Sequence, residues 1–73
     1  MPRFIINQNA QPQSDDHEVH NVTAGCSYMP EAHNQIDLGE HASCHGAVAL
    51  AKTRWPNYRI NGCYYCCNAC HTT

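Results

Sequence analysis

The sequence has few of the large apolar residues from which a hydrophobic core is built. Its 73 residues include one Trp, one Phe and four Tyr. A domain of this size buries only about 60% of the surface that its unfolded chain exposes. Burial alone therefore does not offset a backbone entropy cost of roughly 1–2 kcal/mol per ordered residue. We expect residues 1–73 to form a single small domain that needs a covalent or metal staple.

Long hydrophobic runs are absent as well. The apolar run near the N-terminus, Phe4 to Ile6, is shorter than the roughly 7–15 apolar residues of a secretory signal. It is shorter still than the roughly 20 residues of a transmembrane helix. We therefore expect a cytoplasmic chain with no membrane role. Disulfides do not persist in a reducing cytosol, so clustered cysteines there indicate metal or redox chemistry.

Positive charge is also scarce, with four Lys and Arg residues and a formal net charge of −2. Binding to a nucleic acid duplex through counterion release requires many phosphate contacts, and four cations supply few of them. The charge therefore favours a protein over a nucleic acid as the macromolecular partner. It identifies neither that partner nor the oligomeric state.

Cysteine and histidine, by contrast, are abundant, with six residues of each type. Structural zinc sites take four tetrahedral thiolate or imidazole ligands, two of which are usually close in sequence. The motif Cys63-Tyr-Tyr-Cys66 is such a pair, and Gly62 before it permits a backbone that a side chain would obstruct. A second pair, His20 and Cys26, lies upstream and again has a glycine before the cysteine. We predict that Zn2+ is the cofactor and that these four residues bind it.

Other ligand sets remain open, because Cys67-x-x-Cys70 repeats the spacing of the first motif. The alternative metal or thiol residues are Cys44, Cys67, Cys70 and His71. The motif Cys63-x-x-Cys66 is favoured over Cys67-x-x-Cys70 because only Cys63 directly follows a glycine. A contact between Cys44 and Cys70, reduced or as a disulfide, would join the predicted helix to the C-terminal tail.

The remaining histidines are expected to be solvated, namely His17, His33, His41 and His45. His41 and His45 have the i, i+4 spacing of a helical metal pair, but the residue after His41 is Ala42 where a hydrolytic motif has Glu. The sequence therefore predicts no catalytic residues and no enzyme.

The pattern of apolar and turn residues predicts a small α+β metal-stapled domain. Residues 3–7 and 17–22 are expected to form an N-terminal β-hairpin around a polar loop at 8–16. Residues 40–55 are rich in Ala and repeat apolar residues at helical spacing. Asp37 or Ser43 is the expected cap and Pro56 the stop. The tail then forms the Cys-x-x-Cys knuckle.

With His20, Gly25-Cys26, the Ala-rich helix and Gly62-Cys63-x-x-Cys66 in this order, the chain resembles Ada-like small zinc-binding domains. That resemblance covers residues 17–66 and implies a hairpin, a helix and a knuckle around one metal ion. Those domains use four cysteines, whereas His20 stands in the first pair here, so methyl-transfer repair is not implied. The chain also resembles uncharacterised small Cys/His-rich bacterial proteins, which implies no activity.

The predicted function is that of a non-enzymatic, zinc finger-like structural module that mediates a macromolecular interaction. Its expected contact surface consists of exposed aromatic and basic residues, namely Trp55, Tyr58, Arg59, Tyr64 and Tyr65. Two alternatives stay open. One is a secreted mini-protein stapled by disulfides, and the other is a thiol redox or metal storage or sensing protein.

Overall fold

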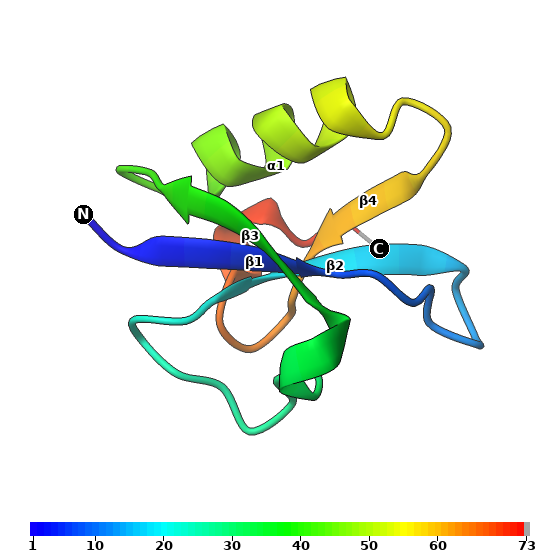
Figure 1. Cartoon of the computed structure of the whole chain (residues 1–73), viewed down its shortest axis with the longest axis horizontal. Coiled ribbons are helices and arrows are strands. Elements are labelled where there is room, and N and C mark those ends of the chain that lie inside the picture. The colour runs from blue at the N-terminus through cyan, green and yellow to red at the C-terminus, as the bar shows by residue number, and fades with distance from the viewer. Residues whose placement is uncertain (73) are drawn as a thin grey trace.

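The computed structural model describes residues 1–72, which form one sheet, one α-helix and two short 3-10 turns (Figure 1). The strands, in chain order, are β1 (Arg3–Asn7), β2 (Asp16–Asn21), β3 (Gln35–Glu40) and β4 (Arg59–Gly62). The helices are η1 (Ala32–Asn34), α1 (Cys44–Arg54) and η2 (Asn68–Cys70). The predicted small α+β domain is confirmed.

The sheet has the strand order β3-β1-β2-β4. Strand β1 pairs antiparallel with both β2 and β3, whereas β4 runs parallel to β2. Helix α1 covers one side of this sheet, and the segment that joins β2 to β3 runs along the other side (Figure 1). Because β2 and β4 are parallel, their C-terminal ends lie at the same edge of the sheet.

The N-terminal hairpin was predicted correctly within one residue at each boundary. Ile6 pairs with Val19 and Ile5 with His20. Phe4, Ile6 and Val19 belong to the core cluster that includes three residues of α1. Since successive strand residues point to opposite faces, Ile5 and His20 point away from the helix.

One expectation about the end of the polar loop and one about the first histidine of the hairpin are wrong. Asp16, expected at the end of the loop, begins β2 and is buried, where Asn61 donates a hydrogen bond of 3.2 Å to its carboxylate. His17, expected to be solvated, is buried because its ring stacks on Tyr58 at 3.9 Å and its Nδ1 lies 3.0 Å from the carbonyl oxygen of Asn7.

Strand β3 has no counterpart among the sequence predictions. Asp37, Gly39 and Glu40 are residue types that strands use sparingly, which hides the strand in the sequence. Its pairing with β1 is interrupted by a bulge between Phe4 and Ile5, and Gly39 there has a φ of 80°. The bulge explains why residue 39 is a glycine, since few other residues adopt positive φ readily.

Helix α1 starts four residues later than expected, at Cys44. The expected first turn does not form because Glu40 still belongs to β3. Ser43 is the cap, and its hydroxyl accepts a hydrogen bond from the His45 amide, whereas Asp37 lies in β3. The helix ends at Arg54 before Pro56, as the sequence predicts.

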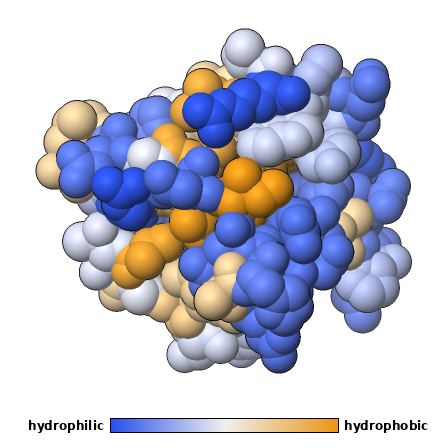
Figure 2. Space-filling view, viewed as in Figure 1, coloured by the Kyte–Doolittle hydropathy of each residue, from blue (hydrophilic) through white to orange (hydrophobic). Residues whose placement is uncertain are grey.

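The core is small and is made largely of alanine, cysteine and a few aliphatic residues. Its buried members are Phe4, Ile6, Val19, Leu38, Cys44, Ala47, Ala51, Cys63, Cys67 and Cys70. On the face seen in Figure 2, apolar residues form only a narrow band between hydrophilic ones. Four of the ten core residues are cysteines, so the chemistry of the thiols determines how well the domain holds together. No helix within residues 1–72 is long and apolar enough to cross a membrane.

Candidate metal centre

Four predicted ligands meet at the edge of the sheet where β2 and β4 end. His20, Cys26, Cys63 and Cys66 each offer one ligand atom, and these atoms all lie within 4.8 Å of one another. The Sγ atoms of Cys26 and Cys63 are 3.7 Å apart, and the Sγ atom of Cys66 lies 3.5 Å from Nδ1 of His20. This group, called the metal cluster below, could hold a metal ion.

The first two residues of the cluster come from β2 and the turn that follows it. His20 is 1% exposed. Asn21 organises the turn, because its carbonyl oxygen accepts from the Gly25 amide at 3.1 Å and its side-chain oxygen from the Ala24 amide at 3.0 Å. Gly25 has a φ of 82°, a conformation that few other residues adopt. The turn thereby returns Cys26 to the end of its own strand.

The other two residues come from the knuckle directly after β4. The Cys63 amide donates to the Val19 carbonyl at 2.9 Å, which ties the start of the knuckle to β2. The Cys67 amide donates to the Cys63 carbonyl at 2.9 Å and closes the turn. A Cβ on Gly62 would lie 2.7 Å from the Cys67 carbonyl oxygen and 2.6 Å from Cβ of Cys70. The turn therefore requires glycine at position 62, for the reason that the sequence suggests.

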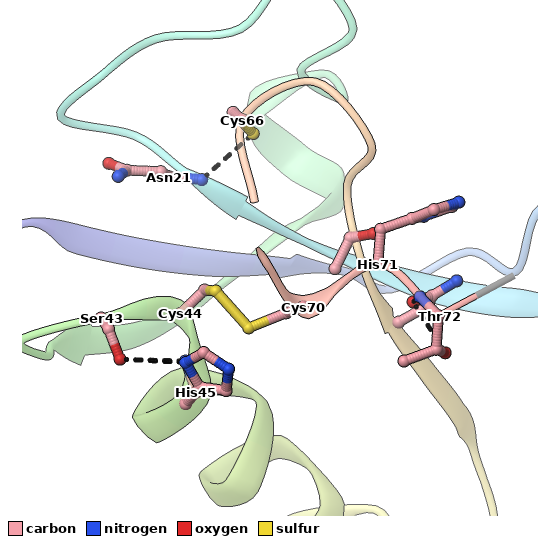
Figure 3. The surroundings of a disulfide bond; sticks show 10 residues. Asn21, Ser43, Cys44, His45, Cys66, Cys70, His71 and Thr72 are labelled. Atoms are coloured by element: carbon pink, nitrogen blue, oxygen red, sulfur yellow. Dashed lines mark hydrogen bonds between the residues drawn. A yellow bond between two sulfur atoms is a disulfide. The ribbon is translucent and has the colours of Figure 1, made fainter. Parts of the chain in front are cut away.

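Backbone amides point at the sulfur atoms of the knuckle. The Asn21 amide donates to Sγ of Cys66 at 3.3 Å, a contact drawn in Figure 3. The amides of Tyr65 and Cys66 donate to Sγ of Cys63. Such donors stabilise negative charge on sulfur, so the knuckle is arranged for thiolates.

Burial acts in the opposite direction on the same groups. It raises the pKa of the Cys63 and Cys66 thiols and lowers the pKa of His20. In each case burial disfavours the charged form. Burial thus opposes charge on these three residues, and a bound cation is what would make thiolates favourable there.

Glu18 lies behind the imidazole of the cluster. Its Oε1 atom is 3.7 Å from Nε2 of His20, on the side of the ring opposite the Nδ1 that faces Cys66. Both residues are on the same face of β2 because they are two positions apart. A carboxylate behind a ligating histidine fixes the orientation of the ring and raises its basicity.

We expect a Glu18→Ala variant to bind one metal ion per chain with an affinity lowered by about 10–100-fold. Titration against a competing chromophoric chelator measures this. Glu31→Ala is the control, since that carboxylate is 80% exposed and faces His33, outside the cluster. Equal affinities of the two variants would show that Glu18 does not support the histidine.

The alternative ligands do not form one site. Cys70 is disulfide-bonded to Cys44, and His71 directs Nδ1 to the Gly62 carbonyl at 3.0 Å. Cys67 is 3% exposed, and burial raises its pKa to about 11. It lies beside the cluster but is not one of the four clustered ligands. Of the two Cys-x-x-Cys registers, only Cys63-x-x-Cys66 places both sulfurs with the upstream pair.

The predicted contact residues fall into two groups at opposite ends of β4. At its start, Tyr58 stacks on the half-buried Trp55, and Arg59, the first residue of the strand, is exposed. After it, Tyr64 and Tyr65 are 56% and 64% exposed and meet edge to face.

A third exposed tyrosine belongs to the second group and is absent from the predicted contact residues. Tyr28 is 61% exposed and stacks on Tyr65, with ring centroids 4.3 Å apart. The sequence signal that could have identified Tyr28 is its position two residues after Cys26, because residues close in sequence to one ligand lie near the other ligands. Tyr28, Tyr64 and Tyr65 together are called the tyrosine surface below.

Comparison of the chain with protein-family models, with curated proteins and with solved structures gives no match. Of the Ada-like resemblance, the structure shows the coarser feature, a Cys/His cluster that could hold a metal ion beside a hairpin and a helix.

Proposed function

We propose that this chain is a non-enzymatic module in which His20, Cys26, Cys63 and Cys66 bind one Zn2+ ion. The ion stabilises the fold, and the folded module contacts another macromolecule through the tyrosine surface. A protein partner is favoured over a nucleic acid.

The spacing of the ligand atoms is the observation that carries the assignment to zinc. Tetrahedral zinc with Zn–S bonds of about 2.3 Å and Zn–N bonds of about 2.0–2.1 Å places two sulfurs about 3.8 Å apart and a sulfur and nitrogen about 3.6 Å apart. The corresponding separations are 3.7 Å for Cys26 and Cys63 and 3.5 Å for Cys66 and His20. Both agree with one tetrahedral ion, and the set of three thiols and one imidazole is common in structural zinc sites.

The position of the cluster explains why the ion would be structural. It joins residues as far apart in sequence as His20 and Cys66, which are 46 positions apart. Metal binding of this kind contributes to folding directly, at about 10–16 kcal/mol of apparent binding free energy for zinc-finger peptides. Four protein ligands leave no open position for water or substrate, which supports a non-catalytic role.

The tyrosine surface supports the contact role. Large aromatic side chains that stay exposed next to a rigid site are typical of protein interfaces. Among the four cations, Arg3 is engaged with Asp37 at 2.9 Å. This leaves few charges for phosphate contacts, which favours a protein partner.

Four cysteines without a disulfide, three of them in the metal cluster, favour this proposal over a mini-protein held by three disulfides. Metal storage gains support from a different group, Cys44, His45 and Cys70, which could also hold a metal ion.

Elemental analysis with chelation tests the proposal. We expect one zinc per chain, and we expect a strong chelator to remove it with loss of the folded circular dichroism and near-ultraviolet signals. The same measurements are made on a Tyr64→Ser/Tyr65→Ser double variant. If these rings form a contact surface, the variant keeps its zinc and unfolds within about 0.5 kcal/mol of the wild type, as exposed substitutions do.

Two results would contradict parts of this proposal separately. Purified protein that binds no zinc, yet is folded, would exclude the structural metal. A tyrosine variant that binds zinc weakly or unfolds much more easily would show that the rings protect the metal cluster, and the contact surface would have to be abandoned.

A further inference from the structure

A disulfide lies away from the metal cluster. It joins Cys44, the first residue of α1, to Cys70, the last residue of η2, with their Cα atoms 6.3 Å apart. In Figure 3 the disulfide is on the helix side, and Cys66 of the metal cluster is beyond the strands. The two groups have no residue in common.

His45 completes a second set of three potential ligands. A ring nitrogen of His45 and the sulfurs of Cys44 and Cys70 all lie within 4.8 Å of one another. His45 is exposed, and its Nδ1 is 3.4 Å from the Ser43 hydroxyl. In Figure 3 its ring lies beside the disulfide, at the start of the helix.

Two members of the group, His45 and Cys70, line a hollow between α1 and the C-terminal tail. This hollow has a volume of about 350 Å³, and its lining includes His45, Val48, Lys52, Ile60, Cys70 and Thr72. A small reductant or a metal ion can therefore approach Cys70 and His45 from outside without disturbing the metal cluster.

We propose that Cys44, His45 and Cys70 form a second metal site that exists only when their disulfide is reduced, and that it binds a soft monovalent ion, Cu(I). The oxidised chain holds the two sulfurs as a covalent link, and the reduced chain holds them through the metal. The link between helix and tail is then kept in both redox states.

The reduction step needs a dithiol as reductant. One thiolate of the dithiol attacks a sulfur of the disulfide, the S–S bond breaks, and the other cysteine leaves as a thiolate. The second thiolate of the reductant then attacks the reductant's sulfur in the mixed disulfide. The mixed S–S bond breaks, the first cysteine leaves as a thiolate and the reductant forms its own disulfide, so two electrons pass to the protein. The ion displaces the proton of each cysteine thiol when it binds.

The ligand chemistry selects Cu(I) among common ions. Thiolates are soft ligands and prefer Cu(I), which accepts three ligands, whereas structural zinc takes four. Cys44 is at the N-terminus of an 11-residue helix, where the helix dipole stabilises a thiolate. Two thiolates and one Cu(I) leave a net charge of −1, and Lys52 in the hollow is a cation of the opposite sign.

Metal counting on oxidised and reduced wild-type protein tests the proposal without any mutation. Zinc-loaded protein is reduced with a dithiol, freed of it without air and titrated with Cu(I) against a chromophoric Cu(I) chelator, with zinc measured in parallel. We expect the reduced chain to bind one Cu(I) more than the oxidised chain and to keep its zinc. The oxidised sample measures any exchange of copper for zinc at the metal cluster.

Two variants then assign the ion to these residues. His45→Ala should weaken Cu(I) binding to the reduced chain by about tenfold or more, because losing a ligand costs at least as much as losing a residue that supports one. His33→Ala, an exposed histidine outside both groups, should leave it unchanged.

Equal copper binding by oxidised and reduced chains would overturn the proposal. So would equal effects of the two histidine variants, or loss of the fold on reduction of the zinc-loaded protein. These results are distinct from failure of the zinc proposal, because a chain that binds no zinc can still bind one additional Cu(I) ion after its disulfide is reduced.

Discussion

A Cys63→Ala variant is expected to bind no zinc at neutral pH and to be unfolded under conditions in which the wild type is folded. Cys63 is 1% exposed, and its sulfur lies 3.7 Å from that of Cys26. Losing it removes one of four ligands, and structural zinc contributes about 10–16 kcal/mol. The net stability of a whole domain is only about 5–15 kcal/mol. Without the ion, the small core of this chain does not hold the fold.

Cys67→Ala is the matched control because the same substitution removes a similarly buried thiol, 3% exposed. Its sulfur belongs to the core but not to the metal cluster. We expect this variant to bind one zinc and to lose about 1 kcal/mol for the smaller side chain. Circular dichroism and zinc analysis of both variants measure the difference. The opposite pattern, with Cys67 essential and Cys63 dispensable, would replace the proposed ligand set by the second register.

The parts of the fold that the sequence predicted are those with local signals. The hairpin follows from β-branched and aromatic residues on both sides of a polar loop, and the end of α1 follows from Pro56. The metal cluster has a local signal too, since Gly25 and Gly62 each precede a cysteine and each is needed there for a backbone reason. A short motif carries this information because each pair of ligands is presented by a single turn.

The features that the sequence did not predict depend on contacts between distant segments. Strand β3 is specified by its pairing with β1, not by its own residue types. Similarly, His17 is buried because Tyr58 stacks on it from 41 positions away in sequence. The contact between Cys44 and Cys70 was one of several open pairings. Only the packing of η2 against α1 brings these two sulfurs together.

Gly62→Ala is expected to destabilise the zinc-bound domain by about 3 kcal/mol or more, at the upper end of the cost of overpacking. The added Cβ would lie 2.6 Å from Cβ of Cys70 and 2.7 Å from the carbonyl oxygen of Cys67. Neither neighbour is the end of a flexible side chain. The Cys67 carbonyl is backbone, and Cys70 is fixed by its disulfide to Cys44, so the knuckle itself has to move and the metal ligands move with it.

Gly25→Ala provides the comparison, because Gly25 also directly precedes a cysteine of the metal cluster. A Cβ there meets nothing within 4 Å, so the only cost is that of a positive φ, 82°, which is about 1–2 kcal/mol for a residue other than glycine. Denaturant unfolding of both zinc-loaded variants gives the two free energies. A loss at Gly62 no larger than that at Gly25 would mean that the knuckle adapts to a side chain. The close approach to Cys67 and Cys70 would then not be what requires glycine before Cys63.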